Sequence, residues 1–224
     1  SDSPHSGFSP DSIEHNVSRE VVERLEQLAR DRQVSLEVVL YVCWQVWLAR
    51  VTQQRDLVCW WRCHGRPYEE LKEGIGLFER WLPVNGVLDP QMSVQDLISR
   101  AVQTHSHAIE WQEYFPTEEH GGPLNALTDS IGFEYERVEG PYRIEQSLLT
   151  LERSILTTEP FKLRLACSQR DRALRLTWHY ASDRIPYEPL QYFAGQFTEL
   201  LRSAAEHADD PVEKLDMVGG QERQ

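Results

Sequence analysis

The spacing of apolar residues changes repeatedly along this chain between the period of a helix and that of a strand. From residue 18 to residue 32, apolar side chains recur every three or four positions, which predicts an amphipathic helix capped by Ser18. From residue 35 to about residue 52, two apolar stripes share one helical period, so we expect a helix that is buried on more than one side. Gln45 interrupts the most apolar run of this second helix, Val38–Leu48.

Alternating apolar and polar residues predict the strands of a sheet. The first part of Asp56–His64 is apolar on both faces, which indicates a central strand that is covered on two sides. Residues 161–168 and 174–180 alternate on either side of a turn at residues 170–171, which is typical of a hairpin with one face in water. Other strands are expected at residues 13–17, 80–84, 129–138 and 142–151.

Two further helices and the order of the elements predict the fold class. Ser93 and Asp96 form a capping-box pattern at the start of a helix that ends near Glu110, and Pro186 precedes the most regular helical pattern of the chain. Helices before and after the strands, with a hairpin near the end, predict an α/β (α+β) fold in which helices flank a mixed β-sheet.

The irregular segments divide the chain. Residues 111–128 contain no periodic pattern, and we expect a long loop there. Residues 1–12 and 210–224 are polar, and we expect them to be linkers on either side of one globular lobe formed by residues 13–209.

Composition narrows the class of protein. The chain has 224 residues, 40% of them hydrophobic and seven of them tryptophan, which is enough to bury a core. Its net charge of −13 repels nucleic-acid phosphates and anionic lipid. Because no signal peptide or membrane-spanning run is visible, we expect a cytoplasmic protein without nucleic-acid or membrane partners. The four cysteines then fit buried thiols in a reducing compartment.

Two patterns of cysteine and histidine suggest a metal site, but their geometry argues against one. Cys59 and Cys63, which precede His64, stand four residues apart on a strand, so their side chains lie about 13 Å apart and cannot share one ion. His105 and His107 lie two residues apart on a helix and point in different directions, so we expect a solvated pair. The sequence therefore predicts no metal site.

His179 and Asp183 form the one arrangement that would suit catalysis. A histidine at the end of a strand, followed four residues later by an aspartate, is how several acyltransferases place a general base. A simpler interpretation is that His179 lies on the polar face of its strand with Arg175 and Thr177, and that Asp183 caps the last helix. We therefore predict that the chain has no catalytic residue, and His179 and Asp183 are the candidates to check.

Several motifs resemble the C-terminal lobe of condensation domains from nonribosomal peptide synthetases. The buried helix ends in Leu-Ala-Arg-Val-Thr at residues 48–52, the next strand leads into Gly-Arg-Pro at residues 65–67, and residues 75–78 read Ile-Gly-Leu-Phe. Tyr-Ala-Ser-Asp at residues 180–183 resembles the Tyr-Ala-Thr-Asp of that family. Residues 210–224 resemble the linker that leads into an adenylation domain. The resemblance begins at about residue 8 and implies half of a chloramphenicol-acetyltransferase-like fold.

The chain also departs from the pattern of this family. Residues 79–83 read Glu-Arg-Trp-Leu-Pro where the family continues Val-Asn-Thr-Leu-Pro, and residues 111–115 replace most of His-Gln-Asp-x-Pro-Phe-Glu. The bulky and charged side chains at the first place count against an inherited substrate tunnel. The catalytic His-His-x-x-x-Asp-Gly of the first lobe does not occur in this sequence.

The resemblance implies two alternative functions. In the first, the chain is a truncated, noncatalytic condensation-like lobe that acts as a structural platform for the adjacent adenylation domain. In the second, it is the C-terminal half of an active, peptide-bond-forming condensation domain whose His-His lobe lies upstream or on another chain. Both assemblies include carrier proteins that bear phosphopantetheine, whereas the chain itself is expected to hold no cofactor.

Two surfaces are expected to contact partners. One is the surface that would face a first lobe, and the other is the tail, whose apolar residues stand among charges as in a segment laid along a neighbouring domain. The residues assigned to these surfaces are Glu79, Arg80, Trp81, Trp111, Phe115, Val212, Leu215 and Val218.

Overall fold

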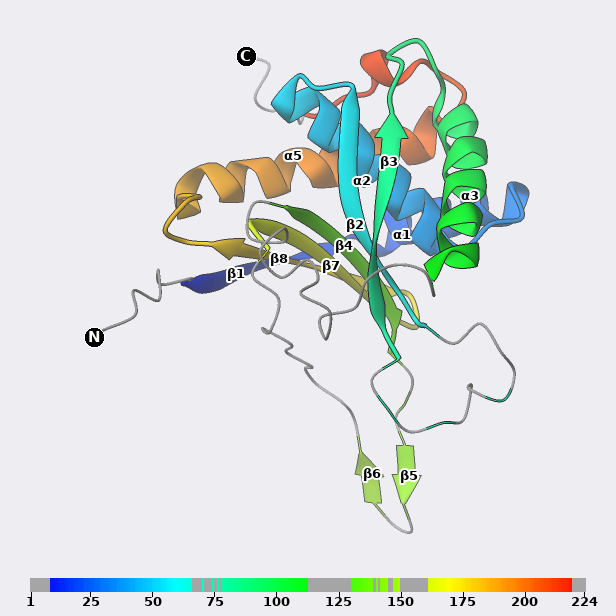
Figure 1. The fold of residues 1–224 in the computed structure, drawn as a ribbon, viewed down its shortest axis with the longest axis vertical. Coiled ribbons are helices and arrows are strands. Elements are labelled where there is room, and N and C mark those ends of the chain that lie inside the picture. The colour runs from blue at the N-terminus through cyan, green and yellow to red at the C-terminus, as the bar shows by residue number, and fades with distance from the viewer. Residues whose placement is uncertain are drawn as a thin grey trace.

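A computed structural model shows one β-sheet with helices packed on it (Figure 1). It describes residues 9–65, 70, 74, 76, 78–112, 130–138, 140, 142–144, 147–149 and 161–218. Most of the loop expected at residues 111–128, including Phe115, lies outside the described residues.

The sheet contains six strands in the order β1-β8-β7-β4-β2-β3. β4 runs parallel to both of its neighbours, β7 and β2, and the other neighbouring strands are antiparallel. This mixed sheet confirms the predicted fold class. The strands are β1 (Pro10–Val17), β2 (Asp56–Cys63), β3 (Arg80–Val87), β4 (Ile131–Arg137), β7 (Leu163–Arg170) and β8 (Ala173–Ala181).

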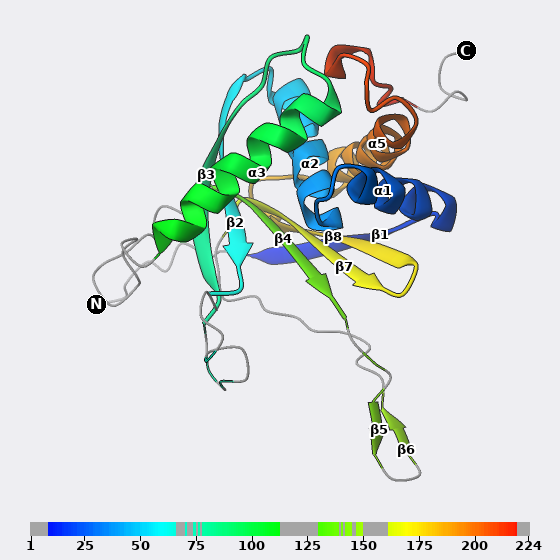
Figure 2. The same ribbon diagram turned by 90° about the vertical axis from the view of Figure 1, so that its right-hand side faces the viewer.

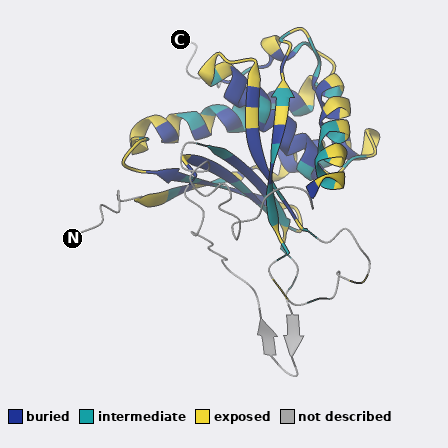
Figure 3. Ribbon diagram, in the orientation of Figure 1, coloured by how far each residue is buried: buried dark blue, intermediate teal, exposed yellow. Residues whose placement is uncertain are grey.

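The helices of the described chain lie together on one face of the sheet (Figure 2). They are α1 (Arg19–Asp31), α2 (Leu36–Thr52), α3 (Val94–Glu110) and α5 (Tyr187–Glu206). α2 is the central helix, because it contacts α1, α3 and α5 as well as strand β2. Its side chains are buried on nearly every side (Figure 3), as its two apolar stripes predict.

Within the described residues, no single helix is long and apolar enough to cross a membrane. α1 and α2 pass the same test of length and composition only when they are taken together, as a pair with a bend of 108° between them.

The predicted caps account for two of the helix starts. The Ser18 hydroxyl accepts a hydrogen bond from the Val21 N–H at 3.5 Å. At α3 the capping box is complete, since the Ser93 hydroxyl accepts from the Asp96 N–H at 3.2 Å and the Asp96 carboxylate accepts from the Ser93 N–H at 3.0 Å. The prediction that Asp183 caps the last helix is wrong, because α5 begins at Tyr187, with Pro186 as its cap.

The core between sheet and helices is built around aromatic side chains. Trp44 and Trp47 of α2 stack with ring centroids 5.0 Å apart, and Trp178 of β8 meets both rings edge-on at 5.2 and 5.1 Å. Phe197 of α5 packs against the same cluster. These rings fix the separation between α2, the sheet and α5, since each of them is at most 2% exposed.

Three expectations about the strands need correction. β2 is covered on two sides only in part, because on the face away from the described helices Trp60 is 7% exposed whereas Val58 is 56% exposed. The strand expected at residues 142–151 is instead a separate pair of short antiparallel strands, β5 (Tyr142–Ile144) and β6 (Ser147–Leu149). The first strand begins at Pro10, inside the expected linker, because it pairs with β8 as far as Ala181.

Gly65, which begins the Gly-Arg-Pro motif, has a conformation that requires glycine. Its φ is +61°, and a β-carbon at this position would lie 1.5 Å from the carbonyl oxygen of Phe78. The chain after β2 therefore turns at a point where the backbone that leads into β3 passes directly against it.

Candidate functional site

The catalytic candidate His179 lies on the face of the sheet that points away from the helices, which we call the open face. Its neighbours in sequence, Trp178 and Tyr180, point into the core, so alternation along β8 places His179 on the opposite side. Its cross-strand neighbours there are Ser12 of β1 and Arg164 of β7.

Asp183 lies in the turn after β8 and is exposed. Its Oδ2 atom is 3.8 Å from Nε of the adjacent Arg184. The Asp183 carboxylate thus forms an exposed ion pair with the Arg184 guanidinium, and such a pair adds little to stability.

An aromatic cluster covers the β2–β3 end of the open face. Trp60 and Phe161 are buried there, and Trp81 of β3 lies against them. The rings of Trp81 and Phe161 have centroids 4.6 Å apart. This cluster is the apolar part of a face that is otherwise mainly polar.

A buried ion-pair network adjoins the aromatic cluster. The Glu134 carboxylate of β4 lies 2.7 Å from Nη1 of Arg62 on β2 and 3.6 Å from Nε of Arg164 on β7. The three side chains are only 11%, 14% and 4% exposed. The Arg164 guanidinium also lies 6.0 Å from the centroid of the Trp81 ring. Such a network rigidifies three adjacent strands, because removing either partner would leave a buried charge unpaired.

Residues expected to face a first lobe lie next to this network. Glu79 is exposed, and its Oε1 atom is 3.4 Å from Nη2 of Arg62. Nη1 of Arg80 donates to the carbonyl oxygen of Gln112 at 3.0 Å, so the start of β3 lies beside the end of α3. Trp111 is 56% exposed, and its indole N–H donates to His107 at 3.0 Å. The structure thus brings residues 79–81 and 111–112 together on one side of the molecule.

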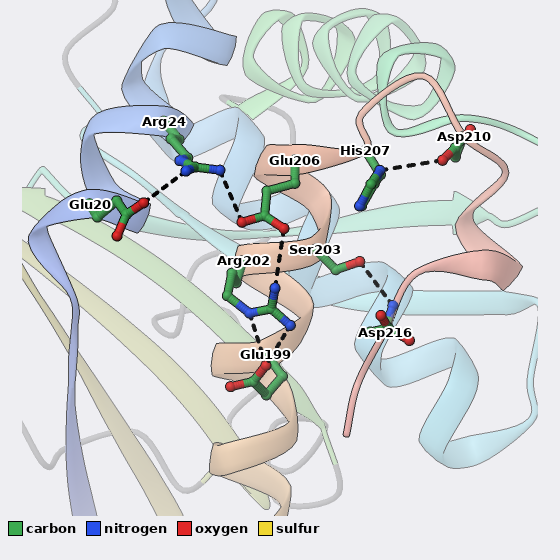
Figure 4. Close-up of polar contacts among 9 residues, drawn as sticks. All are labelled: Glu20, Arg24, Glu199, Arg202, Ser203, Glu206, His207, Asp210 and Asp216. Atoms are coloured by element: carbon green, nitrogen blue, oxygen red, sulfur yellow. Dashed lines mark hydrogen bonds and ion pairs between the residues drawn. The ribbon is translucent and has the colours of Figure 1, made fainter. Parts of the chain in front are cut away.

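Residues 207–218, which we call the strap, lie against the helices of this chain. Val212 and Leu215 are only 1% and 3% exposed, so the expectation that they contact a neighbouring domain is wrong. The Val212 N–H donates to the Met92 carbonyl at 2.8 Å, and the Ser203 hydroxyl of α5 accepts from the Asp216 N–H at 2.9 Å (Figure 4). A 3₁₀ turn at Val212–Lys214 lets the apolar residues of the strap reach the core, and Val218 is half-buried beyond it.

Ion pairs connect α1 and α5 beside the strap (Figure 4). Arg24 of α1 contacts Glu20 at 2.7 Å and Glu206 of α5 at 2.9 Å. Arg202 contacts Glu206 at 3.1 Å and Glu199 at 2.9 Å. Because all of these groups reach water, each pair stabilises the fold by less than about 1 kcal/mol. Their main effect is to align α5, which carries the strap, with α1.

The expectation that His105 forms a solvated pair with His107 is wrong for His105. Its ring stacks on the indole of Trp61 with centroids 3.7 Å apart, and its Nε2 atom lies 3.6 Å from the Cys63 sulfur. Burial lowers the pKa of His105 to about 4 and raises the pKa of Cys63 to about 12. Both groups are therefore neutral at pH 7, so this contact is not an activated thiolate–imidazolium pair.

Trp61 itself is held on every side. Tyr41 stacks on the ring with centroids 4.0 Å apart, and Glu37 of α2 accepts a hydrogen bond from the indole N–H at 2.6 Å. Burial raises the pKa of Glu37, although the indole N–H acts against this rise. The cluster joins α2, β2 and α3 at one point, and its role is structural.

Metal binding has no support among the described side chains, because they contain no group of three histidine, cysteine, aspartate or glutamate residues that could hold an ion. Cys59 is fully buried, and burial raises the pKa of its thiol to about 12.

The sequence pattern did not predict the ion-pair network of Glu134 or the burial of His105 against Trp61. Arg164 was expected on the wet face of its hairpin, but it is 3% exposed, with Glu134 on the adjacent strand β4 and Arg62 on the next strand, β2. Glutamate and arginine at alternating strand positions are a signal for such a network only when the strand order is known, and periodicity does not supply that order.

Comparison with known proteins identifies the family. A family model described as "Condensation domain" matches residues 1–224. The chain is 25% identical over 229 aligned positions to surfactin synthase subunit 2 of Bacillus subtilis (strain 168), which covers 99% of the chain and 6% of that protein. It is 22% identical to bacitracin synthase 1 of Bacillus licheniformis, over 95% of the chain and 4% of that protein. The chain thus spans a small part of these relatives.

Solved structures share the fold. A four-domain nonribosomal peptide synthetase bound to AMP and glycine superposes with a TM-score of 0.77 at 15% identity, over 96% of this chain and 18% of that one. The first condensation domain of the CDA synthetase gives a TM-score of 0.75 at 16% identity, over 94% of this chain and 48% of that one. The chain therefore spans about half the length of that solved domain. Since the family model matches from the first residue to the last, this chain belongs to the condensation-domain family of nonribosomal peptide synthetases.

Proposed function

We propose that this chain is a noncatalytic condensation-type lobe that serves as a structural platform for an adenylation domain in a nonribosomal peptide synthetase. The observation that carries this proposal is the strap. It is fixed to α5 through Ser203 and Asp216, to α2 through a hydrogen bond from Arg50 to the Leu215 carbonyl, and to the start of α3 through Met92. A segment that follows the strap would therefore leave the lobe at a defined point and in a defined direction.

The surroundings of His179 support the noncatalytic part of the proposal. The sequence contains no pair of adjacent histidines. His179 lies mid-face on the sheet between Ser12 and Arg164, and Asp183, its only counterpart in the sequence pattern, follows in a turn beside Arg184. A general base must reach the proton that it removes, so it has to point into a site that can hold the substrate. We assign His179 no such role.

The platform proposal is tested by loosening the strap without unfolding the core. Residues 210–224 resemble the linker to an adenylation domain, so we would express this chain together with such a domain. The test variant combines Ser203→Ala with Arg50→Met. We expect faster proteolysis within the strap and altered amino-acid activation, measured by ATP–pyrophosphate exchange. Arg19→Met is the matched control, because it removes an exposed ion pair within α1 and leaves the strap contacts intact.

Unchanged activation in a variant whose strap is cleaved faster would contradict the platform proposal, because the adenylation domain would then not depend on where the strap holds it. Unchanged cleavage as well would show that the hydrogen bonds of Ser203 and Arg50 do not hold the strap.

A second function is favoured by the open face, whose aromatic and ionic groups could form one wall of an acyl-transfer site completed by another lobe. The chain spans 48% of a solved condensation domain, which is compatible with this function. The test is to mix this chain with a separately expressed lobe that carries the His-His motif and with two loaded carrier proteins. Product above the level obtained with that lobe alone would favour the second function. Product formed by this chain without the lobe would contradict the noncatalytic assignment, because one lobe supplies only one wall for positioning.

A further inference from the structure

A pocket of about 210 Å³ lies on the helix side of the molecule, between α2, β3 and α3. It is separate from the two surfaces discussed above, because the open face lies across the sheet and the strap contacts Arg50, Met92 and Ser203, none of which lines the pocket. The residues that line it are Tyr41, Gln45, Val84, Asn85, Gly86, Val87, Leu97, Arg100, Ala101, Gln103 and Thr104.

The floor of the pocket explains the one polar residue in the middle of the buried helix. Gln45 interrupts the most apolar stretch of α2, and its side chain faces this pocket. Its Nε2 atom donates to the hydroxyl of Tyr41 at 3.0 Å, and Tyr41 is fully buried. A carboxamide has two N–H donors and an acceptor oxygen, so this single bond uses only part of its capacity. The amide can therefore donate its remaining N–H to the face of an aromatic ring held in the pocket.

Gly86 of β3 makes room for this amide. A β-carbon at residue 86 would lie 2.1 Å from Nε2 of Gln45 and 2.8 Å from its Cδ atom. Any larger residue at position 86 would push the Gln45 amide out of its position. The sequence thus combines a polar residue in a buried helix with a glycine on the facing strand, and the pocket lies where they meet.

The walls and the rim differ in chemistry. Leu97, Ala101 and Val84 are buried apolar residues. Arg100, one turn after Asp96 on α3, is exposed at the rim, and its Nη1 atom is 3.5 Å from the Val87 carbonyl. The Asp96 carboxylate is already bonded to the Ser93 hydroxyl and N–H at the helix start. The Arg100 guanidinium therefore keeps N–H donors for an anion, which it binds with fork geometry.

We propose that this pocket binds a small monocarboxylate with one aromatic ring. The ring would lie against Leu97 and Ala101 with its face towards the Gln45 amide N–H at the inner end, and the carboxylate would lie at Arg100. The size agrees, because an apolar cavity of about 150 Å³ already accommodates benzene, and this pocket is moderately larger and open to solvent on one side.

The experiment uses the full chain and two probes of nearly equal shape, phenylacetate and 2-phenylethanol. Amide chemical shifts are followed by two-dimensional NMR during titration with each probe. We expect saturable shifts confined to the amides around Gln45, Gly86 and Ala101, with a dissociation constant on the order of 1 mM for phenylacetate. Phenylethanol, which lacks the charge, should bind on the order of tenfold more weakly.

Three variants decide which features carry the binding. Arg100→Gln should reduce phenylacetate binding to the level of phenylethanol, whereas Arg19→Gln, an exposed arginine on α1, should change nothing. Gly86→Ala should weaken both probes on the order of tenfold or more, because it displaces the Gln45 amide. If Gly86→Ala shifts the melting temperature enough to suggest misfolding, Gln45→Met is the second test of the floor: it removes the amide N–H that faces the ring without touching the strand, and it should weaken both probes.

The proposal is overturned if the shifts fail to saturate, if they fall mainly on the open face, or if the two probes bind equally well. It is also overturned if Arg100→Gln keeps the preference for phenylacetate. None of these outcomes bears on the platform function, which depends on the strap.

Discussion

Replacing His105 by phenylalanine should reduce the acid sensitivity of this domain between pH 6.5 and pH 4. In the folded chain the imidazole lies on the Trp61 ring, and burial lowers its pKa from 6.5 to about 4. In the unfolded chain the imidazole titrates near its ordinary pKa. Within this window the unfolded state therefore binds a proton that the folded state does not, so the free energy of unfolding falls as the pH falls.

The size of the effect follows from the difference between the two pKa values. One pKa unit corresponds to about 1.4 kcal/mol, so the fall from 6.5 to about 4 corresponds to about 3 kcal/mol at most. Because part of the ring reaches water, we discount this to about 2 kcal/mol. The loss begins near pH 6.5 and is complete near pH 4. Glu37 acts in the opposite direction, since its raised pKa lowers stability as the pH rises above 4.5.

The assay is urea unfolding followed by tryptophan fluorescence at several values between pH 4 and pH 7.5. His105→Phe keeps the stack on Trp61 but cannot be protonated, so its stability should fall by about 2 kcal/mol less than that of the native chain between pH 6.5 and pH 4. His107→Phe, on the exposed side of the same helix, is the control and should keep the pH dependence of the native chain. His15, whose pKa burial also lowers, remains in all three proteins and cancels in the comparison. Parallel curves for the native chain and His105→Phe would refute the reasoning.

Three further changes should affect stability by calculable amounts. Glu134→Ala should lower the free energy of unfolding by about 3 kcal/mol in urea titrations, because it leaves Arg62 and Arg164 as uncompensated buried charges; a loss below about 1 kcal/mol would show that solvent already screens them. Trp178→Ala should cost about 3 to 5 kcal/mol in the same measurement, since it opens a cavity among the stacked tryptophans, and a smaller loss would mean that the cluster collapses to fill it. Ser93→Ala should cost about 1 kcal/mol, visible as a lower melting temperature, and Ser93→Asn should restore most of it because asparagine also caps helices and adds no charge beside Asp96; failure of that rescue would contradict the capping role.

The elements with local signals could be predicted from the sequence, and the reasons are visible in particular residues. The capping box at Ser93 requires only residues three positions apart, and the two stripes of α2 require only one helical period. The hairpin of β7 and β8 was also predicted, because its strands alternate around one short turn at Asp171, which has a φ of +51°. All of these features depend on contacts within a few residues of sequence.

The expectations that failed concern which surface covers which. The sequence Asp56–His64 does not indicate that the described helices lie on the same face of the sheet. For this reason its apolar pattern predicted that Val58 is buried. The apolar residues of the strap, Val212 and Leu215, suit a groove on a neighbour and a groove on this chain equally well. Arg164 was classed as wet because arginine usually is, whereas its position beside Glu134 depends on the parallel pairing of β4 with β7. Such contacts join residues thirty or more positions apart, so periodicity carries no information about them.

The distribution of apolar area on the open face bears on the choice between the two proposed functions. An interface between domains of one chain typically covers on the order of 600 to 1,500 Å². Two aromatic side chains of this face, however, are already buried within the chain. Trp60 and Phe161 are 7% and 3% exposed within this chain, and the exposed large apolar side chains of the described strands on this face are Val58 and Val87, at 56% and 54%.

The rest of the described open face, towards β8 and β1, presents polar side chains such as His179 and Ser12. A second lobe would therefore have to form a mostly polar interface there, with little gain from burying apolar surface. The strap, in contrast, already holds its own end of the chain in place through buried anchors and hydrogen bonds from three helices. The apolar contacts thus lie mainly under the strap, and the described sheet face is mainly polar. This arrangement suits the orientation of a following domain better than the packing of a preceding lobe. We therefore rank the platform function first.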